Sequence, residues 1–203
     1  MLTSIEVEKV QDFLKWMEEK FTLNLMSDRA KRRFIKRGQV YRCKLGIGIG
    51  SEMQKERPCV IIQNNIGNQK SGNTIVAPIT HDDSKFPFLV PFTIQKNGKG
   101  EVLLDGQVNV SNIICVSKAR LGDYVATLSN DDMRGVEIAI AKSLGLMGHY
   151  NKIKENLDDK LEFIEKIKKD RNEAQDFIKK LKDITQTTTD KELEEIIIKS
   201  LTE

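Results

Sequence analysis

The chain has 203 residues, 39% of them hydrophobic, and its 33 Lys and Arg residues nearly balance 30 Asp and Glu residues, for a formal net charge of +3. This length suits one ordinary domain with appendages, and so balanced a composition does not by itself indicate a nucleic-acid or membrane partner. No segment reaches the roughly 18 apolar residues that a membrane-spanning helix needs, and the acidic, amphipathic N-terminus is unlike a secretion signal, so we expect a cytoplasmic protein.

The first element that the sequence predicts is a helix over residues 3–25. Thr3 followed by Glu6 makes a capping-box pattern. Apolar residues then recur at spacings of three and four: Val10, Phe13, Leu14, Met17 and Phe21. This periodicity is typical of an amphipathic helix, and we expect its apolar face to be buried.

A basic run follows in "DRAKRRFIKRG", with six basic residues from Arg29 to Arg37 and the single acid Asp28. One interpretation is a solvated helix face. The other is a surface that contacts the phosphates of a nucleic acid.

From Arg37 to about Met147 the chain consists of short apolar runs split by Gly, Asn and Pro, which predicts strands. The runs "CVIIQ" and "TIVAPI" are continuous, so we expect both faces of these strands to be buried, whereas the proline in "FLVPFTI" indicates an edge strand. Closely spaced strands without long helices between them predict a small barrel or a strongly bent sheet.

Helical periodicity returns after Ser129, where Ser129 or Asn130 can cap a helix that ends at Gly145. Residues 151–184 then predict a long charged amphipathic helix. Arg171 interrupts its apolar stripe, which leaves open whether the helix self-associates as a coiled coil. After "TQTTTD", Thr189 or Asp190 can cap a last short helix.

The expected domain organisation has three segments. A helical extension covers residues 1–36, a barrel domain covers residues 37–148, and a charged helical extension covers residues 149–203. The predicted fold class is α+β.

The sequence offers little for metal or nucleotide chemistry. Cys43, Cys59 and Cys115 lie far apart in apolar contexts, which favours buried reduced thiols. The only histidines, His81 and His149, show no metal-ligand spacing, and no P-loop or dinucleotide glycine pattern is present. We expect no metal and no other cofactor.

Polar residues at strand ends form the candidate site. Pro58 has no N–H and suits the start of a strand, which would hold Arg57 just outside the sheet. The planar guanidinium of arginine matches the oxygens of a phosphate, and a threonine such as Thr80 can donate a hydrogen bond to the same group. The alternative is that Arg57 forms a surface ion pair with Glu52 or Glu56 and that Thr80 simply ends a strand.

The order of several motifs resembles the MazF/PemK family of toxin endoribonucleases over about 110 residues. The motifs are "RGQVY" at 37–41, "GSE" at 50–52, "RP" at 57–58, "VIIQNNIGN" at 60–68, "TIVAPIT" at 74–80 and "ARL…LSNDDM…SLGL" at 119–146. The resemblance implies an SH3-like small barrel, a homodimer and a cognate antitoxin. It also implies metal-independent cleavage of single-stranded mRNA at short sequences, leaving a 2′,3′-cyclic phosphate and a 5′-OH.

The resemblance assigns roles residue by residue. Arg57 and Thr80 match the catalytic arginine and threonine, and Ser51, Glu52 and Gln107 match positions near the substrate path. Arg57 would clamp the scissile phosphate and Thr80 would orient it. The proton acceptor stays open between Glu52 and a phosphate oxygen.

Three residues depart from the family pattern. Gln54 and Lys55 replace glycines that are common in the loop, which we expect to stiffen the loop and add charge. Asn109 replaces an arginine and removes a potential phosphate or base contact. These departures leave the cleavage sequence unpredicted and could reduce activity.

Two alternatives to catalysis stay open. The same fold could bind a protein target such as a topoisomerase, or the basic run from Arg29 to Arg37 could bind nucleic acid without cutting it. For the two helical extensions we expect packing on the barrel or on each other, enlargement of a dimer, or occupation of the antitoxin groove.

Overall fold

The computed structural model describes residues 6–202, which form two compact units. The first unit ends at Leu146 and the second begins at Met147. The division of the sequence into three segments stays a prediction. Among residues 6–202, no helix combines the length and the apolar character that crossing a membrane requires.

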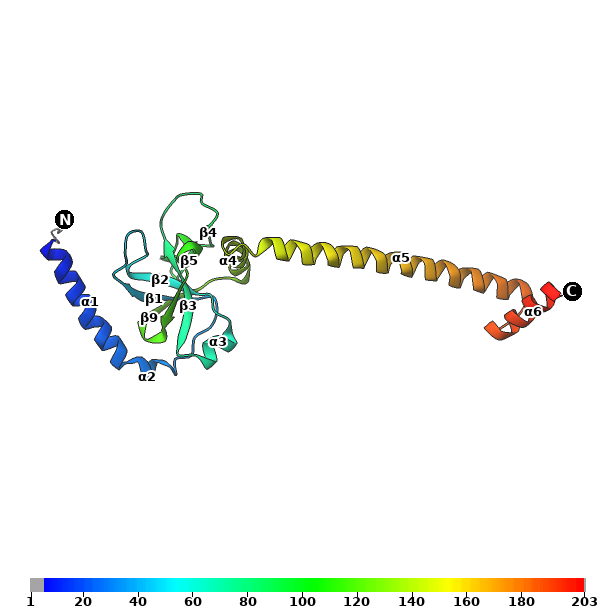
Figure 1. The fold of residues 1–203 in the computed structure, drawn as a ribbon, viewed down its shortest axis with the longest axis horizontal. Coiled ribbons are helices and arrows are strands. Elements are labelled where there is room, and N and C mark those ends of the chain that lie inside the picture. The colour runs from blue at the N-terminus through cyan, green and yellow to red at the C-terminus, as the bar shows by residue number, and fades with distance from the viewer. Residues whose placement is uncertain (1–5, 203) are drawn as a thin grey trace, which may run out of the picture. The chain divides into compact units, whose positions relative to one another are not determined.

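The first unit contains all the strands and four of the α-helices that the structure describes (Figure 1). The strands are β1 (Gln39–Gly46), β2 (Lys55–Ile61), β3 (Asn73–Thr80), β4 (Leu89–Pro91), β5 (Gln95–Lys96), β6 (Val102–Leu104), β7 (Gln107–Asn109), β8 (Ile114–Ser117) and β9 (Leu121–Thr127). The helices are α1 (Val7–Leu25), α2 (Ser27–Ala30), α3 (Asn65–Lys70) and α4 (Asn130–Ser143), with 3-10 turns η1 (Val110–Asn112) and η2 (Lys118–Arg120).

The main sheet is antiparallel and strongly bent. Its strands follow the order β4-β7-β3-β2-β1-β9, and β8 pairs with β3 off this path. The bend lies in β3, whose first half pairs with β8 and whose last two residues pair with β7. The α+β class and the barrel-like core are confirmed, and β4, which carries Pro91, lies at the edge as predicted. Within the described chain, no strand pairing joins β4 to β9, so the sheet does not close.

The apolar runs of β2 and β3 are buried on both faces, as predicted. On β2, Val60 joins one hydrophobic cluster while Cys59 and Ile61 join another on the opposite face. The first cluster includes Met133 and Val136 of α4. Because each face has its own apolar cover, these strands need no polar alternation.

The cap of α4 is Ser129, one of the two residues expected, and it forms a capping box with Asp132. The Ser129 side chain accepts a hydrogen bond from the Asp132 backbone N–H, and the Asp132 carboxylate accepts hydrogen bonds from the Ser129 N–H and hydroxyl. The same carboxylate also accepts from the backbone N–H and hydroxyl of Thr93, at 3.0 and 3.1 Å. Asp132 therefore ties the start of α4 to the segment that follows β4.

We expect Asp132→Ala to lower the free energy of unfolding by about 1–2 kcal/mol at neutral pH, because it removes the box and the tie to Thr93. Burial raises the pKa of Asp132, but hydrogen bonds from Ser129 and Thr93 outweigh it and hold the pKa below the usual 3.8. The stabilisation is therefore fully present when the pH is above the pKa of Asp132 in the unfolded chain. It is lost as the pH falls through the lower pKa of Asp132 in the folded chain.

Urea unfolding followed by near-ultraviolet circular dichroism, which reports the packed pair Tyr41 and Tyr124 of this unit, measures the effect. The difference in the free energy of unfolding between Asp132→Ala and wild type should become smaller below about pH 4. Asp131→Ala is the matched control, because that carboxylate lies in the same helical turn and pairs only with the exposed Arg134. Equal effects of the two substitutions would contradict the assignment.

The N-terminal helix α1 differs from the expectation. The predicted Thr3 cap lies outside the described residues, and the apolar face is not buried, since Phe13 is 54% and Phe21 66% exposed. Instead, α1 places Trp16 against Gly46 at the end of β1, and Glu19 pairs with Lys44. Contacts through one aromatic ring and an ion pair, and not through the apolar stripe, attach α1 to the barrel.

Two arginines of the basic run make structural contacts. The Arg33 guanidinium donates hydrogen bonds to the backbone oxygens of Leu121 and Gly122 and stacks over Tyr41, and Arg37 pairs with Glu137 at 2.8 Å. These two arginines lie neither on a solvated helix face nor free for a phosphate. The interpretation as a phosphate-contacting surface stays a prediction for the remaining basic residues of the run.

The expectation of buried thiols is confirmed for two of three cysteines. Cys43 and Cys59 are reduced and buried on neighbouring strands, and a hydrogen bond with Cys43 together with burial raises the pKa of the Cys59 thiol. Cys115 is reduced but exposed, so the expectation is wrong there. The reason is that Cys115 alternates with the inward-facing Val116 on β8, which has one free face.

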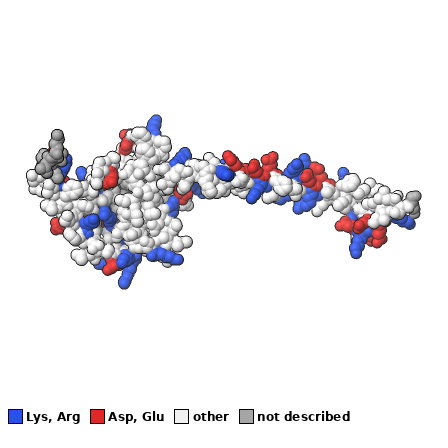
Figure 2. All heavy atoms as spheres, in the orientation of Figure 1, with Lys and Arg blue, Asp and Glu red and all other residues white. Residues whose placement is uncertain are grey.

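The second unit consists of α5 (Met147–Thr185) and α6 (Asp190–Thr202). The long helix is confirmed, and acidic and basic side chains alternate along it (Figure 2). Thr189 accepts a hydrogen bond from the backbone of Glu192, as expected of a cap for α6. No residue of α5 is buried, and its coiled-coil association stays a prediction.

Candidate functional site

Arg57 lies on β2 beside the loop that joins β1 to β2. The expectation that Arg57 precedes the strand is wrong, because β2 begins at Lys55 and Arg57 pairs with Cys43 of β1. On the other side, pairing with β3 begins only at Cys59. The half-buried Arg57 is therefore held by β1 but lies beyond the region where β2 and β3 pair.

Strand register brings three of the predicted residues into one row. Cys59 pairs with Pro78 across β2 and β3, and extending this register two residues past its last pair brings Arg57 level with Thr80, although the two strands do not pair there. Thr80 in turn pairs with Gln107 of β7. Residues opposite one another in an antiparallel sheet point to the same face. Thr80 and Gln107 thus share one face, and the extended register of β2 brings Arg57 level with them; we call these three residues the polar row.

The hydrogen bonds of Arg57 leave the two terminal nitrogens of its guanidinium available to bind another group. Its Nε donates to the backbone oxygen of Gln54 at 3.0 Å. Within residues 6–202, its two terminal nitrogens make no hydrogen bond or ion pair, so the alternative of a surface pair with Glu52 or Glu56 is not what the structure has. The Nε bond fixes the plane of the guanidinium while both terminal nitrogens can still donate to an anion.

Thr80 and Gln107 both contact the turn that follows β3. The Thr80 hydroxyl oxygen accepts from the Asp82 N–H at 3.3 Å, and the Gln107 side-chain amide donates to the Asp82 backbone oxygen at 2.7 Å. The Thr80 hydroxyl keeps its proton for another acceptor. Because Gln107 donates one hydrogen bond to the turn, it also holds the turn at this end of the polar row.

Ser51 and Glu52 lie on the loop between β1 and β2, not in the polar row. Both are exposed, and the Glu52 carboxylate accepts from the Ile49 N–H at 2.9 Å. The loop ends at Gln54, whose backbone oxygen holds Arg57. The structure thus links these residues to Arg57 through the backbone and shows no direct contact with it.

Two of the three departures from the family pattern make structural hydrogen bonds. Asn109 is buried, and its side-chain oxygen accepts from the N–H and hydroxyl of Ser111, so it caps η1. The Gln54 side chain accepts from the Gly48 N–H at 3.4 Å across the loop, and Lys55 adopts a positive φ of 66°. Increased stiffness of the loop stays a prediction.

One pair near the polar row was missed by sequence reasoning. The His81 Nε2 atom lies 2.7 Å from an Asp105 carboxylate oxygen, directly after Thr80. Imidazole is a common proton-transfer group. The two residues are 24 positions apart, and no motif connects them. Among residues 6–202, no group of three or more His, Cys, Asp or Glu side chains gathers as a metal site would.

A bent antiparallel sheet, with an arginine whose terminal nitrogens have no partner among the described residues and a threonine at the end of the next strand, defines a small barrel-like protein. The chain belongs to the family described as PemK-like, MazF-like toxin of type II toxin-antitoxin system, whose model matches residues 36–144. The resemblance seen in the sequence is thereby confirmed.

Individual relatives cover the same part of the chain. Endoribonuclease EndoA of Bacillus subtilis (strain 168) is 35% identical over 115 residues, which are 56% of this chain and 97% of that protein. A mycobacterial endoribonuclease solved with its cognate antitoxin is 31% identical, with a TM-score of 0.47 over 55% of this chain and 96% of that one. MazF from Deinococcus radiodurans is 18% identical, with a TM-score of 0.49 over 56% of this chain and 98% of that one.

Proposed function

We propose that this chain is the toxin of a toxin-antitoxin pair and cleaves single-stranded RNA at short sequences without a metal ion. Membership of the PemK-like, MazF-like toxin family and 35% identity to a protein named as an endoribonuclease support the activity. The observation that supports this choice of site is the polar row, in which the terminal nitrogens of Arg57 have no partner in the part of the chain that the structure describes and Arg57 is level with Thr80 in the extended strand register.

In the proposed reaction, the 2′-oxygen of a ribose attacks the adjacent phosphorus and the bond from phosphorus to the 5′-oxygen breaks. The 2′-hydroxyl gives up its proton, the 5′-oxygen gains one, and a 2′,3′-cyclic phosphate and a 5′-OH result. Negative charge builds up on the phosphoryl oxygens during attack. The two terminal nitrogens of Arg57 can stabilise this charge in a bidentate manner, and an arginine stays protonated throughout.

Thr80 would donate its hydroxyl proton to a phosphoryl oxygen and orient the phosphate against Arg57. Such positioning raises the rate by keeping the 2′-oxygen aligned with the bond that breaks. Glu52, on the adjoining loop, or a phosphate oxygen would accept the 2′-proton. Ser51 and Gln107 would contact the RNA on either side of the phosphate.

The family implies the partners. We propose a cognate antitoxin protein that holds the toxin in check, a homodimer, and action in the cytoplasm on mRNA. The rival is a family member without catalysis that binds a protein target, or that binds nucleic acid through the basic run from Arg29 to Arg37.

The test is incubation of the purified chain, freed of antitoxin, with a long single-stranded RNA in EDTA, with the product ends mapped. We expect cuts at a short recurring sequence with 5′-OH ends and cyclic phosphates. Intact RNA, bound or unbound, would reject catalysis and favour the binding alternative.

A matched pair of variants tests Thr80. Thr80→Val keeps the shape but lacks the hydroxyl, and we expect cleavage about tenfold to a hundredfold slower. Thr80→Ser keeps the hydroxyl and should retain most activity. A Thr80→Val protein that cleaves as fast as Thr80→Ser would remove Thr80 from the mechanism.

A further inference from the structure

The N-terminal helix α1 contacts the barrel at the point where β1 enters the loop between β1 and β2. The Trp16 indole ring occupies the space beside Gly46, where a Cβ atom would overlap the ring. Gly46 also has a φ of 89°, which other residues rarely adopt. The ring and the glycine backbone therefore fit each other at the base of the loop.

Two further contacts hold the same end of β1. The Arg120 guanidinium lies 5.2 Å from the centre of the Trp16 ring, and its Nη1 donates to the backbone oxygens of Lys44 and Leu45 at 3.0 and 2.9 Å. The Lys44 ammonium pairs with Glu19 of α1. A cation over an aromatic face and backbone hydrogen bonds from the same group make one connected contact.

The loop carries these contacts onward to Arg57. Its first part is bonded to its last part, because the Gly48 N–H donates to the Gln54 side chain at 3.4 Å. The Gln54 backbone oxygen then accepts from Arg57 Nε at 3.0 Å. The base of the loop, the loop itself and the guanidinium thus form one chain of contacts that starts at Trp16.

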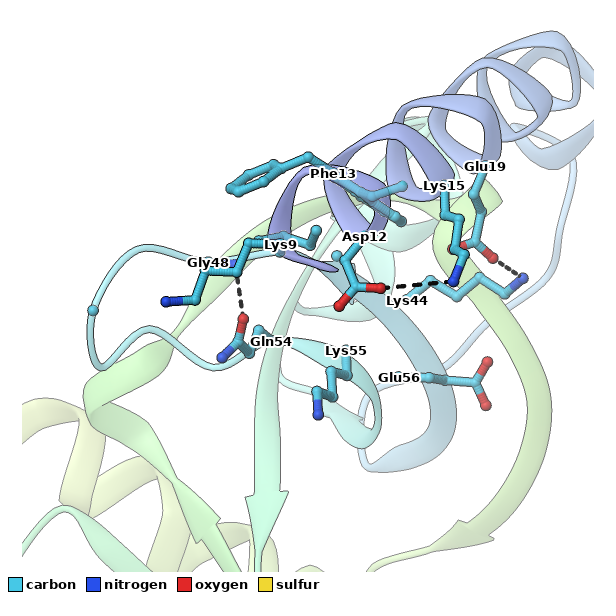
Figure 3. A pocket seen from close by; sticks show the side chains of 14 residues that line it. Lys9, Asp12, Phe13, Lys15, Glu19, Lys44, Gly48, Gln54, Lys55 and Glu56 are labelled. Atoms are coloured by element: carbon cyan, nitrogen blue, oxygen red, sulfur yellow. Dashed lines mark hydrogen bonds and ion pairs between the residues drawn. The ribbon is translucent and has the colours of Figure 1, made fainter. Parts of the chain in front are cut away.

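The helix supports the base of the loop and does not close over it. A cavity of about 950 Å³ separates α1 from the loop, and its walls include Phe13, Lys15, Gly48 and Lys55 (Figure 3). In Figure 3 the helix runs above the loop with Gln54 and Lys55 below it. Because the loop beyond Gly46 is not packed against the helix, α1 can limit the motion of the loop without blocking it.

We propose that Trp16 is a positioning residue: through Gly46 and the loop it keeps Arg57 oriented for the scissile phosphate. The inference rests on the proposed function of Arg57. It gives the N-terminal helix, which lies outside the family match, a role in the rate of the reaction.

The test compares Trp16→Ala, Trp16→Phe and the control Leu14→Ala in the full chain. Leu14 lies on the same helix, is 59% exposed and does not line the cavity beside the loop. For Trp16→Ala we expect kcat for a short RNA to fall about tenfold with KM nearly unchanged, since the misplaced group acts in the transition state. Amide hydrogen exchange in residues 47–54 should accelerate. Trp16→Phe should restore most of both, and Leu14→Ala should change neither.

A milder variant covers the case in which Trp16→Ala fails to fold. Glu19→Gln breaks only the half-exposed ion pair with Lys44 and should shift kcat and loop exchange in the same direction, about twofold to threefold. Unchanged kcat in a folded Trp16→Ala or Glu19→Gln protein, with or without faster exchange, would overturn the inference. If Arg57→Ala itself cleaves normally, the proposed function of Arg57 fails first, and the two failures are distinguishable.

Discussion

Arg57→Ala should slow RNA cleavage by about a hundredfold to a thousandfold, the size of loss typical when a group that stabilises transition-state charge is removed. The physical reason is that both terminal nitrogens of Arg57 lack partners in the described chain, while its Nε is fixed to the Gln54 backbone. A guanidinium held in this way can donate two hydrogen bonds to the phosphoryl oxygens without reorganising. Single-turnover cleavage of a short RNA at saturating enzyme measures the chemical step.

Two variants serve as controls. Arg42→Ala removes an exposed arginine from the neighbouring strand, opposite Pro58, and should leave the single-turnover rate within about threefold. Arg57→Lys keeps the charge but loses the planar fork, and should be slower than wild type and faster than Arg57→Ala. If Arg57→Ala cuts the same sequence within threefold of the wild-type rate, the assignment of Arg57 is wrong.

The polar row could be predicted because it depends on strands with strong sequence signals. The apolar runs after Arg57 and before Thr80 identify two buried neighbouring strands, and both residues lie where these runs give way to polar residues. Pro58 marked the correct strand but not its start, because the pairing with β1 extends to Lys55 while the pairing with β3 does not.

Contacts between residues far apart in the chain could not be predicted from periodicity. The stripe of α1 pointed to burial of Phe13 and Phe21, yet the helix is attached through Trp16, because a glycine 30 positions away leaves room for its ring. The pair His81 and Asp105 likewise depends on how β3 and the segment before β7 meet. Tertiary packing decides which of these residues meet, and the hydrophobic pattern of the sequence alone does not predict that packing.

The basic run illustrates the same limit for charged residues. A cluster of lysines and arginines predicts a solvated or phosphate-binding surface, but Arg33 donates to three backbone oxygens of the segment that ends β8 and begins β9. One of these oxygens belongs to Lys118, a residue that is only 1% exposed. A lysine is almost never fully buried unless its ammonium has partners.

Lys118→Met should lower the free energy of unfolding of the first unit by about 2–4 kcal/mol, because the side chain is buried and its ammonium donates to three backbone oxygens. Its Nζ donates to the backbone oxygens of Asn68, Arg33 and Lys31, at 2.5, 3.1 and 3.5 Å. Methionine fills a similar volume but donates nothing, so these carbonyls would lose a charged donor. Those oxygens belong to α3 and to the segment between α2 and β1, which Lys118 therefore joins.

Amide hydrogen exchange at Val60 and Ala77, paired in the centre of the sheet, measures the opening of this unit without interference from α5. Lys96→Met is the matched control, since Lys96 is exposed on β5 and should change stability by less than about 0.5 kcal/mol. Equal protection of Val60 and Ala77 in the two variants would show that the Lys118 hydrogen bonds contribute nothing net.

The pH dependence of the same comparison has a definite sign. Burial, assisted by the charge of Arg33, lowers the pKa of Lys118 below the usual 10.5. The unfolded chain therefore keeps this proton to a higher pH than the folded chain, and wild-type stability must rise relative to Lys118→Met as the pH increases between the two values. The loss caused by Lys118→Met should accordingly be larger at pH 10 than at pH 7, whereas a lysine that was stabilised as a cation by a carboxylate would show the opposite trend.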